Sequence, residues 1–301
     1  IFFRFQSIKM NCCVCEDPPQ GLTINSTLKL RGGQSMPIFG LGTWNANESD
    51  VVAAVTNALK MGYRLLDTAS LYANEQLIGQ ALKEAPGIGC EAPFVVTKLH
   101  TDCHHKDQVE TELRAQLQSL GLAAVDLYML HSPSGKNCVD TWRGMLRCRD
   151  AGLAKAVGVC NFGALQLQGL KESGLELPEV NQIEVHVWNQ QLPTREYCKE
   201  NGIAVMAYCP LARCQRFGET KLAGSASALG KTEAQLCIRW ALQSGLVCIP
   251  KSTSCKRLQE NASVFDFELS PAQMDELAQM NENYMASNAV RAMCLPWDEV
   301  K

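Results

Sequence analysis

Short apolar runs recur along the chain and alternate with stretches whose apolar residues have helical spacing. The runs occupy residues 64–67, 94–98, 125–130, 154–160, 180–185, 203–208 and 246–250, with a weaker one near Val264. Continuous apolar runs of this length predict parallel strands that are covered on both faces. Alternation of such strands with helices predicts an α/β protein.

The stretches between the runs predict amphipathic helices. In the first of them, Val51, Val52, Val55 and Leu59 fall on one helical face. The predicted helices span about 49–61, 75–82, 106–120, 141–150, 164–173, 194–201, 232–244 and 254–260. A long loop is expected between the strand that ends at 208 and the helix that begins at 232.

Eight strand-and-helix units fit two architectures, a closed (β/α)8 TIM barrel and an open doubly wound sheet. The open sheet would require a glycine-rich turn after its first strand, whereas Gly40 and Gly42 precede any predicted helix. Eight units without a break in composition favour the barrel, formed by a single domain over residues 25–301. Alternating residues around Gly32 and Gly33 predict an N-terminal β-hairpin. Residues 1–24 lack periodicity and are expected to form a flexible extension.

Composition excludes several classes of protein. The net charge of −3 and the absence of basic runs argue against nucleic acid as a partner, and no apolar stretch is long enough for a membrane span. The 15 cysteines are scattered singly, which favours free thiols and a cytoplasmic location. No metal site is expected: Cys12, Cys13 and Cys15 lack partners at the usual ligand spacing, and the polar loop 102–105, which could hold a metal, is better explained as a solvated surface turn.

Four polar residues follow or end predicted strands. Asp67 and Lys98 each end a strand, His131 directly follows one, and Tyr72 lies just beyond Asp67. Each residue alone has an ordinary structural explanation, such as helix capping by Asp67. Together they predict an active site, because the carboxyl ends of barrel strands meet at one mouth.

The segment from Arg64 to Leu82 carries the pattern LDTA…Y…NE…IG…AL, which resembles the aldo-keto reductases, and specifically the aldose reductase-like members. The resemblance extends from about residue 28 to residue 283. It implies that Asp67, Tyr72, Lys98 and His131 form the catalytic tetrad of that family. Tyr72 would donate a proton to the substrate oxygen, and we expect the Lys98 cation to lower the pKa of that phenol toward neutrality. His131 would hydrogen-bond the substrate oxygen.

The resemblance also implies sites for a nicotinamide cofactor. It places cofactor contacts at Thr43, Trp44, Asn161, Gln182, Tyr208 and Leu211. Tyr208 matches a tyrosine that stacks on the nicotinamide ring, and Asn161 and Gln182 match the ligands of its carboxamide. Cys160 stands where the family usually has serine, and a thiol is a weaker hydrogen-bond donor. The short loop after Leu211, at 212–220, suggests a cofactor that is held less tightly.

Residues 249–261 collect cations and hydroxyls at a strand end and the following helix start, which favours an anion site. In the family, matching positions bind the adenosine end of the cofactor, here Lys251, Ser252, Thr253, Arg257, Glu260 and Asn261. Arg257 can donate two hydrogen bonds to a phosphate. We therefore expect NADPH to be preferred to NADH.

The substrate is expected to be a small carbonyl compound. The predicted substrate contacts are Trp44, His131, Trp188 and Trp297, the last in a C-terminal loop over the active site. We predict a monomeric, NADPH-dependent reductase of aldehydes, and also of ketones and aldoses. The alternative is a cofactor-binding regulatory subunit of the potassium-channel β-subunit type with little turnover. The chain has too few metal ligands at its strand ends for a metal-dependent hydrolase. It also lacks the Tyr-x-x-x-Lys motif of a short-chain dehydrogenase.

Overall fold

Eight parallel strands form the centre of the protein in the computed structural model, which describes residues 21–84, 92–103, 108–134 and 137–287. Each strand pairs with the next along the chain. They are β3 (Leu41–Gly42), β4 (Leu65–Asp67), β5 (Phe94–Leu99), β6 (Val125–Leu130), β7 (Ala154–Cys160), β8 (Val180–Glu184), β9 (Ala204–Tyr208) and β10 (Val247–Cys248). The first and last strands also meet, because Gly40 N donates to Cys248 O at 3.0 Å and Cys248 N donates to Ile38 O at 2.8 Å. The predicted (β/α)8 barrel is therefore confirmed.

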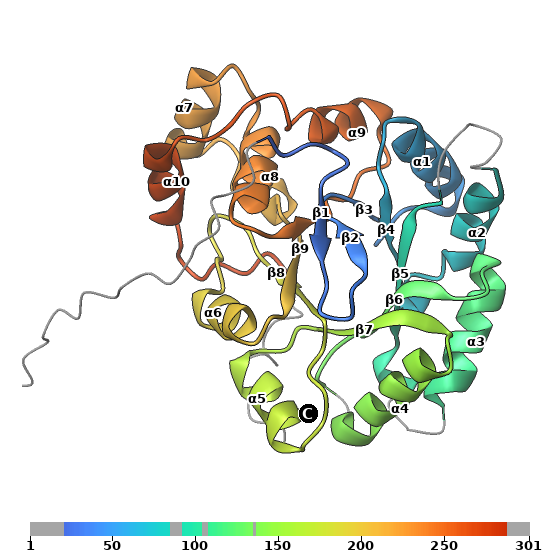
Figure 1. Cartoon of the computed structure of the whole chain (residues 1–301). Helices are drawn as coiled ribbons and strands as arrows, with labels where there is room; N and C mark the ends of the chain where they lie inside the picture. The colour runs from blue at the N-terminus through green and yellow to red at the C-terminus, as the bar shows by residue number, and fades with distance from the viewer. Residues whose placement is uncertain (1–20, 85–91, 104–107, 135–136, 288–301) are drawn as a thin grey trace, which may run out of the picture.

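Helices surround the strands and cover their outer face (Figure 1). They are α1 (Glu48–Lys60), α2 (Glu75–Glu84), α3 (Val109–Leu120), α4 (Cys138–Asp150), α5 (Ala164–Glu172), α6 (Leu192–Glu200), α7 (Thr220–Ala228), α8 (Glu233–Gln243), α9 (Cys255–Ala262) and α10 (Pro271–Ala278). In α1 the predicted apolar face is the buried one, with Val51, Val55 and Leu59 inaccessible to solvent. These side chains join a core that lies between the helices and the strands.

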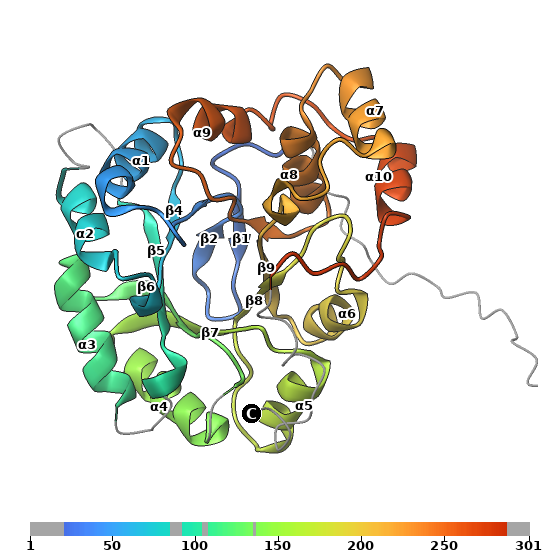
Figure 2. The ribbon, with the colours of Figure 1, turned by 180° about the vertical axis from the view of Figure 1, so that it is seen from behind.

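A second, smaller core fills the barrel itself. Inward side chains such as Leu65, Val96, Leu127 and Met206 interdigitate there. The predicted N-terminal hairpin, β1 (Thr27–Lys29) with β2 (Ser35–Pro37), adds Leu30 and Met36 to this core. It lies across the middle of the barrel, with the helices arranged around it (Figures 1 and 2).

The hairpin closes the end of the barrel at which the strands begin. Gly32 N donates to the buried Glu179 carboxylate at 2.8 Å, just before β8. Arg31 donates to the carbonyl oxygens of Leu177 and Pro178. With this end closed, the opposite end, where the strands terminate, is left for the site.

One predicted strand is wrong. Val264 lies outside any strand, and its carbonyl accepts a hydrogen bond from the Arg239 side chain at 3.2 Å. Its place in the barrel is taken by β3, which belongs to the stretch assigned to the hairpin. The long loop after Tyr208 contains α7, and α10 was not predicted. These two helices lie side by side outside the ring, where Ser225 Oγ donates to Glu276 at 3.2 Å (Figures 1 and 2).

The predicted extension falls largely outside the described residues, which begin at 21. Leu22 and Ile24 pack against the core, so the folded part begins slightly before residue 25. The cysteines at 12, 13 and 15 and the predicted C-terminal loop beyond 287 also lie outside the described residues. Among the residues that are described, no helix combines the length and the apolar character needed to cross a bilayer.

Candidate active site

Lys98 is the centre of the predicted tetrad. Its side chain is fully buried, and its ammonium donates to Asp67 Oδ1 at 2.7 Å, to Thr68 O at 2.9 Å and to Tyr72 Oη at 3.2 Å. Asp67 ends β4 and Lys98 lies near the end of β5, while Tyr72 ends a short 3-10 turn, η1 (Ser70–Tyr72). The strand ends thus bring the carboxylate, the cation and the phenol into one hydrogen-bonded chain.

His131 completes the group from the next strand. It follows β6 directly, and its ring lies 5.7 Å from the Tyr72 ring between centroids, at 73°. Its backbone N–H donates to Leu99 O at 3.3 Å, which continues the hydrogen-bond ladder between β5 and β6. An imidazole edge-on to the phenol is placed to contact the same substrate oxygen.

Burial, rather than the neighbouring cation, decides the ionisation of Tyr72. Removal from water raises the pKa of Tyr72 to about 12, although the Lys98 charge lowers it in part. Lys98 thus acts in the expected direction, but burial outweighs it, and the pKa of Tyr72 is raised instead of being brought toward neutrality. Burial also opposes the charge on Lys98, but Asp67 and Tyr72 outweigh it and raise the pKa of Lys98 above its ordinary value. Tyr72 is thus protonated and Lys98 charged at neutral pH.

Gln182 connects Asp67 to the opposite side of the barrel. Its amide nitrogen donates to Asp67 Oδ2 at 2.7 Å, so both oxygens of that carboxylate are bonded, one to Lys98 and one to Gln182. Gln182 is almost completely buried in β8, yet its side chain lines the cavity described next. Gln182 therefore connects the tetrad, through Asp67, to the predicted site of the nicotinamide carboxamide.

Asn161 and Tyr208 lie beside this group. The Tyr208 hydroxyl donates to Asn161 Oδ1 at 2.8 Å, and Asn161 Nδ2 donates to His131 O at 3.2 Å. Cys160 is buried, with its sulfur 4.0 Å from Met129 Sδ, and burial raises the pKa of its thiol. The thiol therefore stays neutral, and it borders both the apolar barrel interior and the cavity described next.

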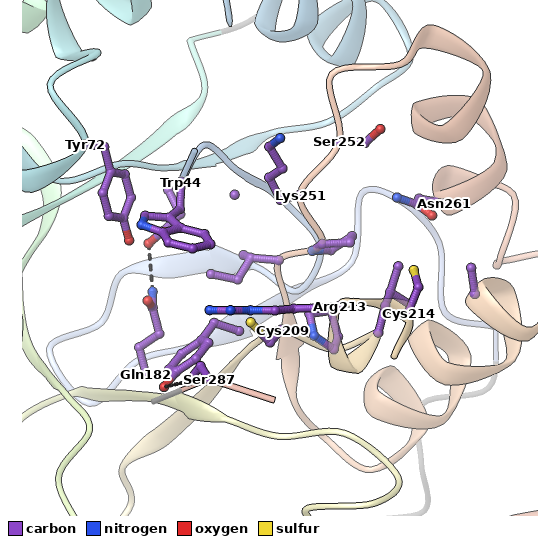
Figure 3. A pocket seen from close by; sticks show the side chains of 18 of the residues that line it. Trp44, Tyr72, Gln182, Cys209, Arg213, Cys214, Lys251, Ser252, Asn261 and Ser287 are labelled. Atoms are coloured by element: carbon purple, nitrogen blue, oxygen red, sulfur yellow. Dashed lines mark hydrogen bonds between the residues drawn. The ribbon is translucent and has the colours of Figure 1, made fainter. Parts of the chain in front are cut away.

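A cavity of about 620 Å³ joins the tetrad to the start of α9. Figure 3 shows Tyr72, Trp44 and Gln182 at one end, Ser252 and Asn261 at the other, and Arg213 between them. Among the predicted site residues, the lining includes Trp44, Asp67, Tyr72, His131, Asn161, Gln182, Tyr208, Leu211, Lys251, Ser252, Arg257, Glu260 and Asn261. An elongated cavity with polar groups at both ends suits an elongated ligand.

The far end of the cavity has the character of an anion site. Lys251 and Arg257 both line it, and the pKa of Lys251 is lowered, first by burial and then by the Arg257 charge. Ser254 caps α9 by accepting from Arg257 N, and Ser252 Oγ accepts from Ser254 N at 3.2 Å. Two cations that repel each other beside a helix N-terminus favour an anion between them.

Besides Lys98, which is fully buried and contacts the lining residues Asp67 and Tyr72, four predicted site residues are not part of this lining. Thr43 is buried behind it and donates to Asp67 O at 2.9 Å, and Thr253 does not reach it. Trp188 is fully buried, with its indole N–H bonded to Glu219 at 3.0 Å, so its predicted substrate contact is wrong in this structure. The chain turns back at His186–Asn189 and directs the indole away from the cavity. Trp297 lies outside the described residues.

The structure adds lining residues that were not predicted. They are Gly42, Leu71, Cys160, Cys209, Pro210, Arg213, Cys214, Phe217, Ala234, Ile249, Pro250 and Ser287. The Arg213 guanidinium lies 4.9 Å from the centre of the Trp44 ring, across the cavity. The sequence shows a cation, Arg213, in the loop after Leu211, which could have suggested a role in the site. The direction of its side chain depends on the backbone of residues 212–214, which all have positive φ. No cluster of metal-ligating side chains occurs in the part of the chain that the structure describes.

Comparison with known proteins agrees with this geometry. Residues 38–282 match the family described as Aldo/keto reductase family. The methylglyoxal reductase DkgA of Escherichia coli (strain K12) is 38% identical over 261 residues, covering 85% of this chain and 94% of the relative. The aldo-keto reductase family 1 member A1-A of Danio rerio is 36% identical over 294 residues, covering 86% and 91%.

Solved structures show the same similarity. The Bombyx mori aldo-keto reductase, determined in complex with NADP, superposes with a TM-score of 0.82 at 35% identity, covering 90% of this chain and 97% of that one. The aldose reductase from Schistosoma japonicum gives a TM-score of 0.80 at 35% identity, covering 85% and 93%.

Proposed function

Because the chain belongs to the aldo/keto reductase family, we propose that it catalyses the NADPH-dependent reduction of aldehydes to alcohols, with Tyr72 as the general acid. Relatives named methylglyoxal reductase and aldose reductase suggest small aldehydes and aldoses as substrates, and ketones extend the range. We further propose that the protein acts as a cytoplasmic monomer.

The observation that supports the proposal most is the bonded chain Asp67–Lys98–Tyr72 at one end of the cavity. Reduction of a carbonyl requires a hydride at carbon and a proton at oxygen. Tyr72 is protonated at neutral pH and can donate that proton, because its pKa is about 12. As the phenolate forms, the Lys98 cation 3.2 Å away stabilises it. Asp67 keeps Lys98 charged in a fully buried position.

NADPH would supply the hydride, and the cavity has groups that fit both of its ends. Asn161 and Gln182 offer amide groups beside Tyr72, and Tyr208 offers an aromatic face for the nicotinamide ring. At the other end, Lys251, Ser252 and Arg257 would hold the adenosine 2′-phosphate, with Glu260 and Asn261 near the adenine. The repulsion between Lys251 and Arg257 supports this assignment, since a phosphate between them would relieve it.

The mouth of the cavity favours apolar aldehydes. Trp44 and Leu71 line it and remain 47% and 55% exposed, so each can still bury apolar surface on a substrate. His131 would share the substrate oxygen with Tyr72. An aldehyde with an aromatic or branched apolar group should therefore be reduced more efficiently than one of the same size that carries hydroxyls.

A panel of carbonyl compounds tests the proposal. NADPH oxidation is followed at constant protein concentration with methylglyoxal, an aromatic aldehyde, an aldose and a ketone. We expect turnover with the aldehydes and the highest kcat/KM for the aromatic one. Tight binding of NADPH without turnover of any compound would instead favour the regulatory-subunit alternative.

A further inference from the structure

Glu184 is a buried carboxylate for which the proposed reaction has no use. It ends β8 with no exposed surface. Four hydrogen bonds converge on it, from Ala286 N at 2.5 Å, Ser287 N at 3.0 Å, Ser287 Oγ at 2.5 Å and His186 Nε2 at 3.1 Å. A strand residue thus holds a segment about a hundred positions further along the chain.

The charge of Glu184 is maintained by these contacts. Burial alone would raise its pKa, but the bonds from His186, Ser287 and Ala286 outweigh burial, and the pKa of Glu184 is lowered. The group is therefore ionised at neutral pH. An ionised acceptor makes stronger hydrogen bonds than a neutral one, so residues 286 and 287 are held firmly.

Ser287 connects Glu184 to the end of the cavity at which the nicotinamide is proposed to bind. Its hydroxyl lies 3.3 Å from the Tyr208 hydroxyl, and Tyr208 is paired with Glu184 in the register of β8 and β9. The Tyr208 hydroxyl in turn donates to Asn161 at 2.8 Å. Figure 3 shows Ser287 at the same end of the pocket as Gln182 and Tyr72.

We propose that Glu184 is a positioning residue for the nicotinamide: it fixes Ser287, and through Ser287 it orients Tyr208 and Asn161. The inference rests on the proposed function, because it assumes that the nicotinamide ring stacks on Tyr208 and that its carboxamide lies beside Asn161. It has a specific consequence. Loss of the Glu184–Ser287 contact weakens binding of the nicotinamide half of NADPH and leaves the adenosine half unaffected.

Two variants and a matched control test this consequence. Ser287→Ala removes only the hydroxyl, and Glu184→Gln removes the charge. The control is Glu179→Gln, which alters another buried glutamate of the same region that accepts a backbone N–H, at the opposite end of the barrel. Calorimetry measures the affinity of each protein for NADPH and for adenosine 2′,5′-bisphosphate, which lacks the nicotinamide.

We expect Ser287→Ala to weaken NADPH about three- to tenfold and Glu184→Gln by more, with unchanged affinity for the bisphosphate. Glu179→Gln should bind both ligands as the unaltered protein does. Hydrogen exchange of the 286–287 amides should slow when the unaltered protein binds NADPH, and not when it binds the bisphosphate.

Equal weakening of both ligands, or no change in NADPH affinity in Ser287→Ala, would overturn the proposal. Ser287→Ala decides the question even if Glu184→Gln does not fold, because its backbone N–H bonds to Glu184 are retained. An unaltered protein that binds the bisphosphate and NADPH equally would refute the nicotinamide site and the proposed function with it. Failure of this inference alone leaves NADPH binding by the unaltered protein intact.

Discussion

The buried Asp67–Lys98 ion pair predicts how the stability of the protein changes when Asp67 loses its charge. Lys98 has no exposed side-chain surface, and Asp67 is its carboxylate partner at 2.7 Å. Asp67→Asn keeps the size of the side chain but leaves the buried ammonium without a counter-charge. Removal of one partner of a buried pair costs about 3–5 kcal/mol. We expect the free energy of unfolding at pH 7 to fall by about that amount.

The same variant should show a reversed dependence on pH. With Asp67 present, the pKa of Lys98 is raised, so the folded and unfolded chains both hold its proton up to the ordinary lysine pKa of about 10.4. Without Asp67, burial lowers this pKa. The unfolded chain then binds the proton more tightly than the folded one, and stability rises with pH by about 1.4 kcal/mol per unit between the two pKa values.

Urea unfolding at pH 7 and at pH 9.5 measures both effects. The control is Asp266→Asn, which breaks an ion pair with Lys231 at 2.6 Å in which Asp266 is 62% exposed. An exposed pair contributes about 0–1 kcal/mol, so this variant should follow the unaltered protein. A loss below about 1 kcal/mol in Asp67→Asn at pH 7, or a pH dependence equal to that of the control, would refute the reasoning.

Three further predictions concern the cofactor and the acid. Arg257→Ala should weaken NADPH about tenfold or more and NADH little, as measured by calorimetry, whereas Lys256→Ala, which alters an exposed lysine outside the cavity lining, should change neither; equal losses for both cofactors would contradict the phosphate site. Cys160→Ser should tighten NADPH about two- to fivefold without affecting adenosine 2′,5′-bisphosphate, because a hydroxyl is a stronger donor than a thiol. The kcat for aldehyde reduction should be constant between about pH 6 and pH 9, since Tyr72, with a pKa of about 12, stays protonated; a decline centred near pH 7 would exclude it as the acid in that state.

Three members of the tetrad could be placed at one mouth of the barrel from the sequence, and the family resemblance added Tyr72, which lies in the turn after β4. Asp67, Lys98 and His131 each end or directly follow a strand, and parallel strands of a barrel bring such positions to one mouth. The gathering of Lys251, Ser252 and Arg257 at one end of the cavity was predictable for a similar reason, since a capped helix start follows a strand.

The failures concern properties that depend on the folded surroundings. Trp188 lies within the turn from His186 to Asn189, whose direction sequence spacing does not specify, and its indole bonds to Glu219 instead of lining the cavity. Arg213 reaches Trp44 because residues 212–214 adopt left-handed backbone conformations that side-chain types do not indicate. The raised pKa of Tyr72 reflects burial, which cannot be judged from the neighbouring residues in the sequence.

The strand that was assigned near Val264 shows a limit of apolar patterning. A barrel strand of two residues, Leu41–Gly42, produces almost no pattern, whereas Val264 is apolar because it is buried in the core between helices and strands. Hydrophobicity reports burial in both cases. Only the backbone hydrogen bonds distinguish the two segments.

The role of Tyr72 as the proton donor is tested most directly by Tyr72→Phe. The matched control is Tyr197→Phe, which removes a hydroxyl on α6 that donates to Gln168 at 2.9 Å, away from the cavity. We predict that Tyr72→Phe binds NADPH with nearly unchanged affinity but reduces aldehydes at least about 100-fold more slowly, while Tyr197→Phe retains full activity. Reduction by Tyr72→Phe at the rate of the control would contradict the account.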